Sequence, residues 1–81
     1  MRKYYFYIAR CFDNSLYVGF CSNLKNREAV HNKGKGAKYT KLRRPVRIVY
    51  FEEFNSLVEA MRREKQVKGW TRVKKEELIK K

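Results

Sequence analysis

Two alternating runs near the start of the chain constrain its fold more than any other feature. Tyr4 to Cys11 and Leu16 to Phe20 both follow the two-residue period of a β-strand. If Phe12, Asp13 and Asn14 form a three-residue loop, with Asn14 in the left-handed conformation, paired residues have numbers that sum to 26. The sequence therefore predicts an antiparallel hairpin of defined register.

This register sorts the hairpin side chains onto two faces of a sheet. One face carries only apolar residues, namely Phe6, Ile8, Leu16, Val18 and Phe20. The other face carries Tyr5, Tyr7, Ala9, Tyr17 and Gly19. We expect the apolar face to pack on the core, and Tyr7 to lie diagonally from Tyr17, within reach of its ring.

A helix and a basic segment follow the hairpin. Ser22 or Asn23 can cap a helix that runs to about Lys33, where Gly34 provides a stop. The stretch from Lys33 to Arg47 holds seven basic residues and no acidic residue, and glycines and a proline interrupt it. We interpret this stretch as a basic loop.

A third strand and two further helices complete the chain. The run VRIVYFEEF, Val46–Phe54, has the composition of a strand. Ser56 followed by Glu59 is a capping box that opens a second helix, and Gly69 ends it. Thr71 can cap a final basic helix. The inward stripe of the second helix consists of Leu57, Ala60, Met61, Glu64 and Val67.

The charge of the chain favours an anionic partner. Residues 1–81, which we expect to form one domain, include 21 Lys and Arg but 8 Asp and Glu, a net charge of +13. Nucleic acid relieves the resulting self-repulsion, because phosphate contacts release counterions. An anionic membrane is the weaker candidate. No stretch approaches the roughly 20 apolar residues that a membrane-spanning helix needs. Arg10 interrupts the N-terminal apolar run before it reaches signal-peptide length, so we expect a cytoplasmic protein.

Glu64 is the unusual member of its helix stripe, because an inward carboxylate needs a compensating charge or hydrogen bonds. An ion pair with Arg27, or with another basic neighbour, is one explanation. A metal ion is the other, since a single carboxylate suits Mg²⁺, which keeps several waters and takes further oxygen ligands from substrate phosphate. The residues alone leave both explanations open.

Three further residues have both a structural and a chemical interpretation. Arg27 and His31 lie one turn apart on the first helix. Arg27 is either a solvated residue or a ligand of a phosphoryl group. His31 is either a structural residue or one that orients water. Tyr17 is either a packing residue or a general base. A phenol with a pKa of about 10 is ionised only to about a thousandth at pH 7, and positive neighbours lower that barrier.

Several motifs that are weak singly occur in a recognisable order along the chain. They are YFY at Tyr5 to Tyr7, YVG at Tyr17 to Gly19, Arg27 with HN at His31 and Asn32, and the glutamate in RREK. This ordered set resembles the GIY-YIG nuclease superfamily over essentially the whole chain. The stretches GKGAKYT and RRPV are similar to its small single-domain bacterial members. The resemblance implies an α+β fold, a three-stranded antiparallel sheet flanked by helices in the order β-β-α-β-α-α.

The resemblance also implies roles for individual side chains. Tyr17 takes the place of the tyrosine that activates water, and Tyr7 that of its partner tyrosine. Arg27 matches the arginine that binds the scissile phosphate, and Glu64 matches the metal-binding glutamate. His31 corresponds to a histidine found near the site in many members. A further tyrosine, Tyr39 in KYT, is either an active-site residue or a loop aromatic.

We therefore expect a metal-dependent endonuclease that hydrolyses DNA, in repair or recombination, with Mg²⁺ or Mn²⁺ as cofactor. The basic residues expected to contact the DNA backbone are Lys35, Lys38, Lys41, Arg43 and Arg44, and the final basic helix is expected to contact it as well. A non-catalytic nucleic-acid-binding module of the same fold, acting on DNA or RNA, is the main alternative. A structural protein that docks on an acidic partner is the other. The chain is expected to be a monomer or weak dimer, and a partner protein could supply specificity.

Overall fold

The computed structural model describes residues 2–81 and has strands and helices close to the predicted ranges. The elements are β1 (Tyr4–Cys11), β2 (Leu16–Cys21), α1 (Leu24–Asn32), α2 (Lys38–Lys41), β3 (Val46–Phe54), α3 (Leu57–Lys68) and α4 (Arg72–Ile79). The α+β fold and the order of its main elements are confirmed. The predicted basic loop differs in one respect, because it contains the four-residue helix α2.

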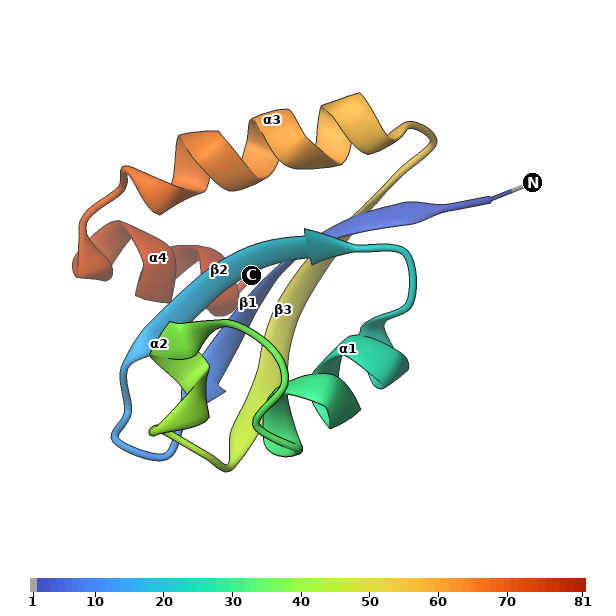
Figure 1. Ribbon diagram of the computed structural model, residues 1–81. Helices are drawn as coiled ribbons and strands as arrows, with labels where there is room; N and C mark the ends of the chain where they lie inside the picture. The colour runs from blue at the N-terminus through green and yellow to red at the C-terminus, as the bar shows by residue number, and fades with distance from the viewer. Residues whose placement is uncertain (1) are drawn as a thin grey trace.

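The three strands form one antiparallel sheet with the order β2-β1-β3, so β1 is central and β2 is an edge strand (Figure 1). The predicted hairpin register is confirmed, since Tyr7 pairs with Gly19 and Ala9 pairs with Tyr17. Asn14 has a φ of 69°, the left-handed conformation that the three-residue loop requires.

The predicted caps are also present. The side chain of Asn23 accepts from the backbone N–H of Asn26 at the start of α1. Ser56 caps α3 through the N–H of Glu59, and Thr71 caps α4. None of the helices in the described part of the chain is long and apolar enough to cross a membrane.

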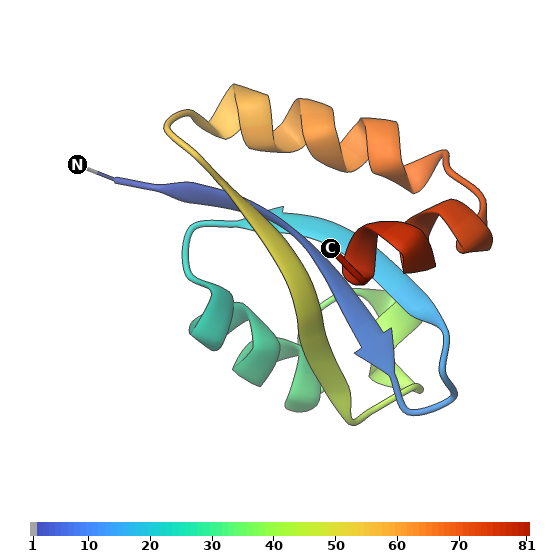
Figure 2. The ribbon, with the colours of Figure 1, turned by 180° about the vertical axis from the view of Figure 1, so that it is seen from behind.

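Helices cover both faces of the sheet (Figures 1 and 2). The helices α3 and α4 cover the face that carries the apolar hairpin residues, and α1 and α2 lie on the opposite side. The buried cluster under α3 and α4 consists of Phe6, Ile8, Val18, Val67 and Leu78. The cluster on the other face consists of Tyr7, Ala9, Cys11, Cys21 and Val46.

Two residues that the sequence assigned to the core do not belong to it. Phe20 is only partly buried, because β2 is an edge strand and a pocket opens beside its end. Leu57 is 42% exposed, because the inward stripe of α3 becomes fully buried only one turn later, at Ala60. The remaining stripe residues of α3 lie against the sheet as predicted, and Met61 is partly buried.

Candidate active site

One open pocket gathers side chains from both sides of the hairpin and from two helices. Its volume is about 360 Å³, and we call it the tyrosine pocket. Its lining residues are Tyr7, Tyr17, Val18, Gly19, Phe20, Arg27, Glu64 and Lys68. Residues from β1, β2, α1 and α3 therefore meet here, although they are far apart in the chain.

Gly19 creates the space in which the tyrosines lie. A Cβ atom at this position would lie 2.6 Å from the Tyr7 hydroxyl and 2.7 Å from the adjacent ring carbon. Because glycine has no side chain, the Tyr7 ring can lie across β2, with its centroid 6.4 Å from that of Tyr17. The diagonal contact expected from the register is therefore present.

His31 lies behind Tyr7 and does not line the tyrosine pocket. It is 1% exposed, and its Nε2 shares a hydrogen bond of 2.8 Å with the Tyr7 hydroxyl. Its Nδ1 shares a second bond of 2.8 Å with the hydroxyl of Thr40 in α2. With both ring nitrogens engaged inside the protein, His31 contacts Tyr7 rather than the space open to a substrate.

Burial disfavours the charged forms of both Tyr7 and His31. Burial raises the pKa of Tyr7 far above its ordinary value, and the neighbouring Tyr17 adds to the rise, while Arg27 opposes it. Burial also lowers the pKa of His31, and the positive charge of Arg27 adds to this decrease. At neutral pH the pair is therefore a neutral phenol bonded to a neutral imidazole.

Arg27 is half-buried at the wall of the pocket. Within residues 2–81, none of the side-chain hydrogen bonds or ion pairs of the structure involves its guanidinium. A guanidinium without an internal partner, beside an open pocket, is suited to bind a phosphate group.

Glu64 is 8% exposed and faces the same pocket. Its ion-pair partner is Lys68, one turn further along α3, at 3.8 Å, so Glu64 pairs with another basic neighbour and not with Arg27. Because the Lys68 side chain is 70% exposed, this ion pair is weak and leaves the carboxylate able to bind another cation.

The protein ligands available in the pocket suit Mg²⁺ or Mn²⁺ better than a metal ion that needs all of its ligands from the protein. Residues 2–81 contain no cluster of three or more His, Cys, Asp or Glu side chains that could enclose an ion. A single carboxylate next to a free guanidinium instead suits a hard cation that obtains its other oxygens from water and phosphate. Glu64 is the residue that would hold it.

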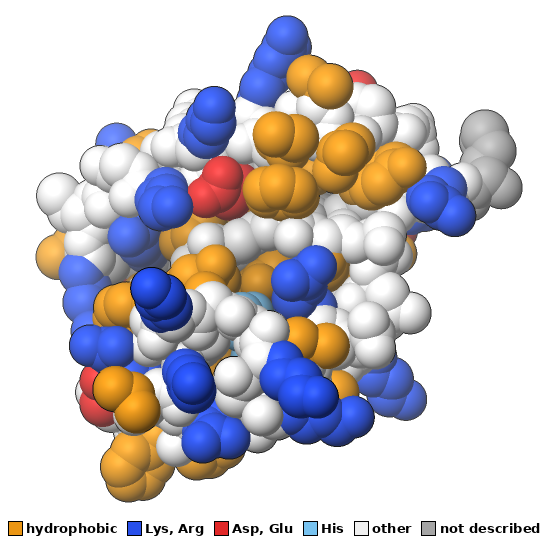
Figure 3. Space-filling model, in the orientation of Figure 1, with side chains coloured by type: hydrophobic (Ala, Val, Ile, Leu, Met, Phe, Trp, Pro, Cys, Tyr) orange, Lys and Arg blue, Asp and Glu red, His pale blue; other side chains and the backbone are white. Residues whose placement is uncertain are grey.

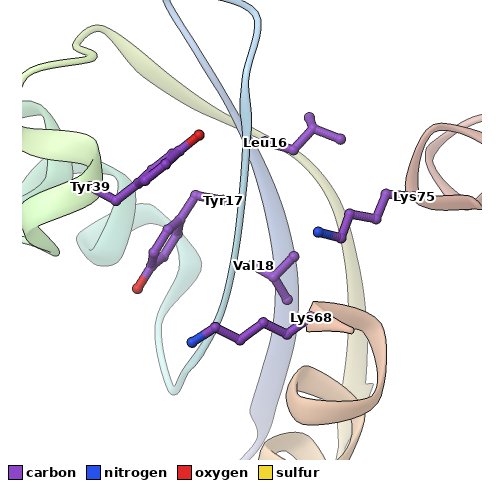
Figure 4. Close-up of a pocket in the computed structure, with 6 residues that line it drawn as sticks. All are labelled: Leu16, Tyr17, Val18, Tyr39, Lys68 and Lys75. Carbon is purple, nitrogen blue, oxygen red and sulfur yellow. The ribbon is translucent and has the colours of Figure 1, made fainter. Parts of the chain in front are cut away.

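A second groove of about 280 Å³ adjoins the tyrosine pocket and shares Tyr17, Val18 and Lys68 with it. Its other lining residues are Leu16, Tyr39 and Lys75 (Figure 4). The rings of Tyr17 and Tyr39 stack with centroids 6.1 Å apart, and Tyr39 is 39% exposed. In Figure 4 the Tyr17 hydroxyl and the Lys68 amino group point to the same end of the groove.

Lys68 was not predicted as a site residue, and Lys75 was expected only as part of the final basic helix. They lie on α3 and α4, and only the packing of these helices against β2 places them beside Tyr17. The one available signal is that Lys68 follows Glu64 by four residues, which places both on one helix face.

The basic residues around α2 fall into two groups. Lys35, Lys38 and Lys41 are exposed, and Lys and Arg side chains surround this part of the surface in Figure 3. Arg43, in contrast, donates to Asp13 at 3.1 Å and lies over the Tyr39 ring. Arg44 donates to a backbone oxygen at 2.9 Å, so the two arginines also hold the segment in place.

Comparisons with known proteins find matches over nearly the whole chain. The family model described as the GIY-YIG catalytic domain matches residues 3–77. A UPF0213 protein of Staphylococcus haemolyticus is 56% identical over 98% of this chain and 96% of its own length. A UPF0213 protein of Pediococcus pentosaceus is 54% identical over 96% of this chain and 82% of its own length.

Two solution NMR structures are similar over the whole fold. A UPF0213 protein from Bacillus halodurans has 45% identity and a TM-score of 0.61, covering 96% of this chain and 83% of that one. A protein from E. faecalis has 40% identity and a TM-score of 0.65, covering 99% of this chain and 85% of that one.

Proposed function

Because the chain belongs to the GIY-YIG family, whose catalytic-domain model matches residues 3–77, we propose that it is an endonuclease that hydrolyses DNA phosphodiester bonds. The observation that carries the proposal is the tyrosine pocket, where two phenols, a free guanidinium and a buried carboxylate share one open space. This combination offers groups for a nucleophile, for the charge on a phosphate and for a cation.

Each side chain has a distinct task in the proposed reaction. Tyr17 directs the attacking water. Its hydroxyl is available for this task, because it has no hydrogen bond to another side chain within residues 2–81. Arg27 neutralises the negative charge that grows on the nonbridging phosphate oxygens in the transition state. Glu64 would hold Mg²⁺ or Mn²⁺, which supplies Lewis-acid stabilisation of the phosphate and the leaving oxygen when bound. Tyr7 is the partner of Tyr17 on the inner wall.

The basic surface holds the substrate in this proposal. Lys68 and Lys75 flank Tyr17, and the exposed lysines near α2 continue the positive surface. Contacts from lysine to phosphate carry no base sequence, so specificity is low and binding weakens steeply with salt. A partner protein in the cytoplasm would then choose the target, and RNA is the other polyanion that such a surface fits.

A plasmid-nicking assay tests the proposal. The wild type is expected to nick supercoiled DNA with Mg²⁺ or Mn²⁺ and to stop with EDTA. Glu64→Gln and Tyr17→Phe are each expected to lose roughly 100-fold or more in rate. The matched controls are Glu77→Gln, an exposed carboxylate on α4, and Tyr4→Phe at the start of β1. Nicking by Glu64→Gln at the wild-type rate would refute the assignment.

The net charge of +13 favours the second function, a module that binds nucleic acid without cleaving it. This function predicts salt-sensitive binding, no nicking with either cation, and equal binding by the wild type and Glu64→Gln. Binding and nicking measured on the same DNA therefore separate the two functions.

A further inference from the structure

A buried chain of hydrogen bonds runs from α2 to the wall of the tyrosine pocket. It links Thr40 to His31 and His31 to Tyr7, with both distances 2.8 Å. These three residues are 0%, 1% and 2% exposed, respectively. Because water is largely excluded, the direction in which each group donates is set by the protein.

Thr40 sets the direction of the chain at its inner end. Its hydroxyl donates to the backbone oxygen of Ala37 at 3.0 Å. A hydroxyl has a single proton, so toward His31 the same oxygen can only accept. If the proton turned to His31 instead, two oxygens would face each other at this distance with no proton between them, and they would repel.

The direction then passes through the imidazole. To donate to Thr40, His31 must carry its proton on Nδ1, and in the neutral ring Nε2 is then an acceptor. The Tyr7 hydroxyl must therefore donate to Nε2. The proton of Tyr7 points inward, and the lone pairs of its oxygen are left for the pocket.

Gly36 supports this arrangement by holding the imidazole in place. A Cβ atom at Gly36 would lie 2.7 Å from His31 Cε1 and closer still to Nδ1. The ring thus lies between Gly36, Thr40 and Tyr7, with little space to turn. The lowered pKa of His31 keeps the ring in the neutral state in which only one nitrogen bears a proton.

We propose that Thr40 is a positioning residue that fixes His31 in the Nδ1–H form, so that Tyr7 presents an acceptor rather than a proton to the tyrosine pocket. The water that Tyr17 directs can then donate a hydrogen bond to Tyr7 and keep an oxygen lone pair free for attack on phosphorus. This last step rests on the proposed nuclease function, whereas the hydrogen-bond direction does not.

The tautomer can be measured directly, because His31 is the single histidine of the chain. In protein labelled with ¹⁵N-histidine, long-range ¹H–¹⁵N NMR distinguishes a protonated from an unprotonated ring nitrogen. We expect the wild type to carry the proton on Nδ1 at neutral pH. A proton on Nε2, or an imidazolium, would overturn the proposal.

Variants identify the residue that sets the tautomer. Thr40→Val keeps the shape and removes the acceptor, and the Ala37 oxygen retains its backbone donors from residues 40 and 41. The ratio of Nδ1–H to Nε2–H is expected to fall roughly tenfold or more, because a buried donor would otherwise lose its partner. Thr40→Ser is expected to restore the wild-type ratio, and Tyr7→Phe to keep Nδ1–H.

An unchanged ratio in Thr40→Val, or a switch in Tyr7→Phe, would contradict the assignment to Thr40. If Thr40→Val does not fold, the wild type, Thr40→Ser and Tyr7→Phe still decide the question. On DNA, Thr40→Val is expected to lower kcat roughly tenfold with KM unchanged, and Thr40→Ser to recover it. A wild type that shows the Nδ1–H form but cleaves nothing would refute the nuclease function alone.

Discussion

The two faces of β1 bury different kinds of side chain. Phe6 and Ile8 point toward α3 and α4, into a cluster whose fully buried members are all apolar. Tyr7 points the opposite way, where the fully buried neighbours include the polar residues His31 and Thr40. Within residues 2–81, no fully buried side-chain nitrogen or oxygen lacks a hydrogen-bond partner.

This difference shows how one strand serves stability and chemistry at once. Apolar packing is non-directional, so the first face depends on volume and shape. A polar interior depends on direction, since an unpaired buried donor or acceptor is costly. The polar face therefore tolerates fewer amino-acid substitutions than the apolar face. It is also the face that supports the tyrosine pocket.

Neighbouring residues on the two faces test the comparison most strongly. Phe6→Ala removes a fully buried ring from the apolar face and is expected to cost about 3–5 kcal/mol of unfolding free energy. Tyr7→Phe keeps the ring but leaves the Nε2 of His31 without a donor, and is expected to cost about 1–3 kcal/mol of unfolding free energy. Urea unfolding of both variants measures these values. Equal losses would show that the two faces do not differ in this way.

Two glycines sharpen the comparison with a smaller effect. Gly19→Ala forces a Cβ against the Tyr7 hydroxyl, which is held by His31, and is expected to cost about 1–3 kcal/mol and most of the nicking activity. Gly69→Ala is the matched control, because the nearest atom would be 3.7 Å from its Cβ. Thermal unfolding and nicking should be nearly unchanged in Gly69→Ala. A stable, active Gly19→Ala would refute the tight fit.

Charges on the helices that cover the two faces are expected to differ in their effect on DNA. Lys38→Ala, on α2, removes a proposed phosphate contact and should lower the slope of log affinity against log salt by about 1. Arg62→Ala removes an exposed charge from α3 and should leave the slope nearly unchanged. Fluorescence anisotropy over a range of salt measures both. Equal slopes in the two variants would argue against a role for α2.

The smallest expected effect concerns an ion pair at the margin of the apolar face. Arg10 donates two hydrogen bonds to Glu76 on α4, and hydrogen bonds from Arg10 and Arg72 lower the pKa of Glu76 from 4.5 to about 2. Because the pKa of Glu76 is lower in the folded state than in the unfolded state, the ionised carboxylate stabilises the folded protein above pH 4.5. This contribution disappears as the pH falls toward 2. Because the pair is partly exposed, we expect less than about 1 kcal/mol.

Urea unfolding of wild type and Glu76→Gln from pH 7 to pH 2 tests this expectation. The two curves should differ at pH 7 and converge in acid, where the wild-type carboxyl is protonated. A difference that stays constant with pH would exclude the ion pair as its cause.

Much of the fold was predictable because its signals are local. The Asn14 loop fixed the pairing of Tyr7 with Gly19, and Ser56 and Thr71 marked the starts of α3 and α4. The gathering of Tyr7, Tyr17, Arg27 and Glu64 in one pocket was expected from an ordered set of motifs, and their catalytic roles stay predictions.

Other features were not predictable from the residues nearby. The short helix α2 has no strong cap, since Ala37 at its start makes no side-chain hydrogen bond. The ion-pair partner of Glu64, and the positions of Lys68 and Lys75, depend on how α3 and α4 lie on the sheet.

The sequence by itself determined the strand period, the register and the helix caps, because these depend on side chains within a few residues of one another. The tertiary structure alone decided that His31 lies behind Tyr7 and bonds to Thr40. The reason is that hydrogen bonds require atoms to be placed within tenths of an ångström, and only the packing of α1 and α2 against the sheet sets such distances.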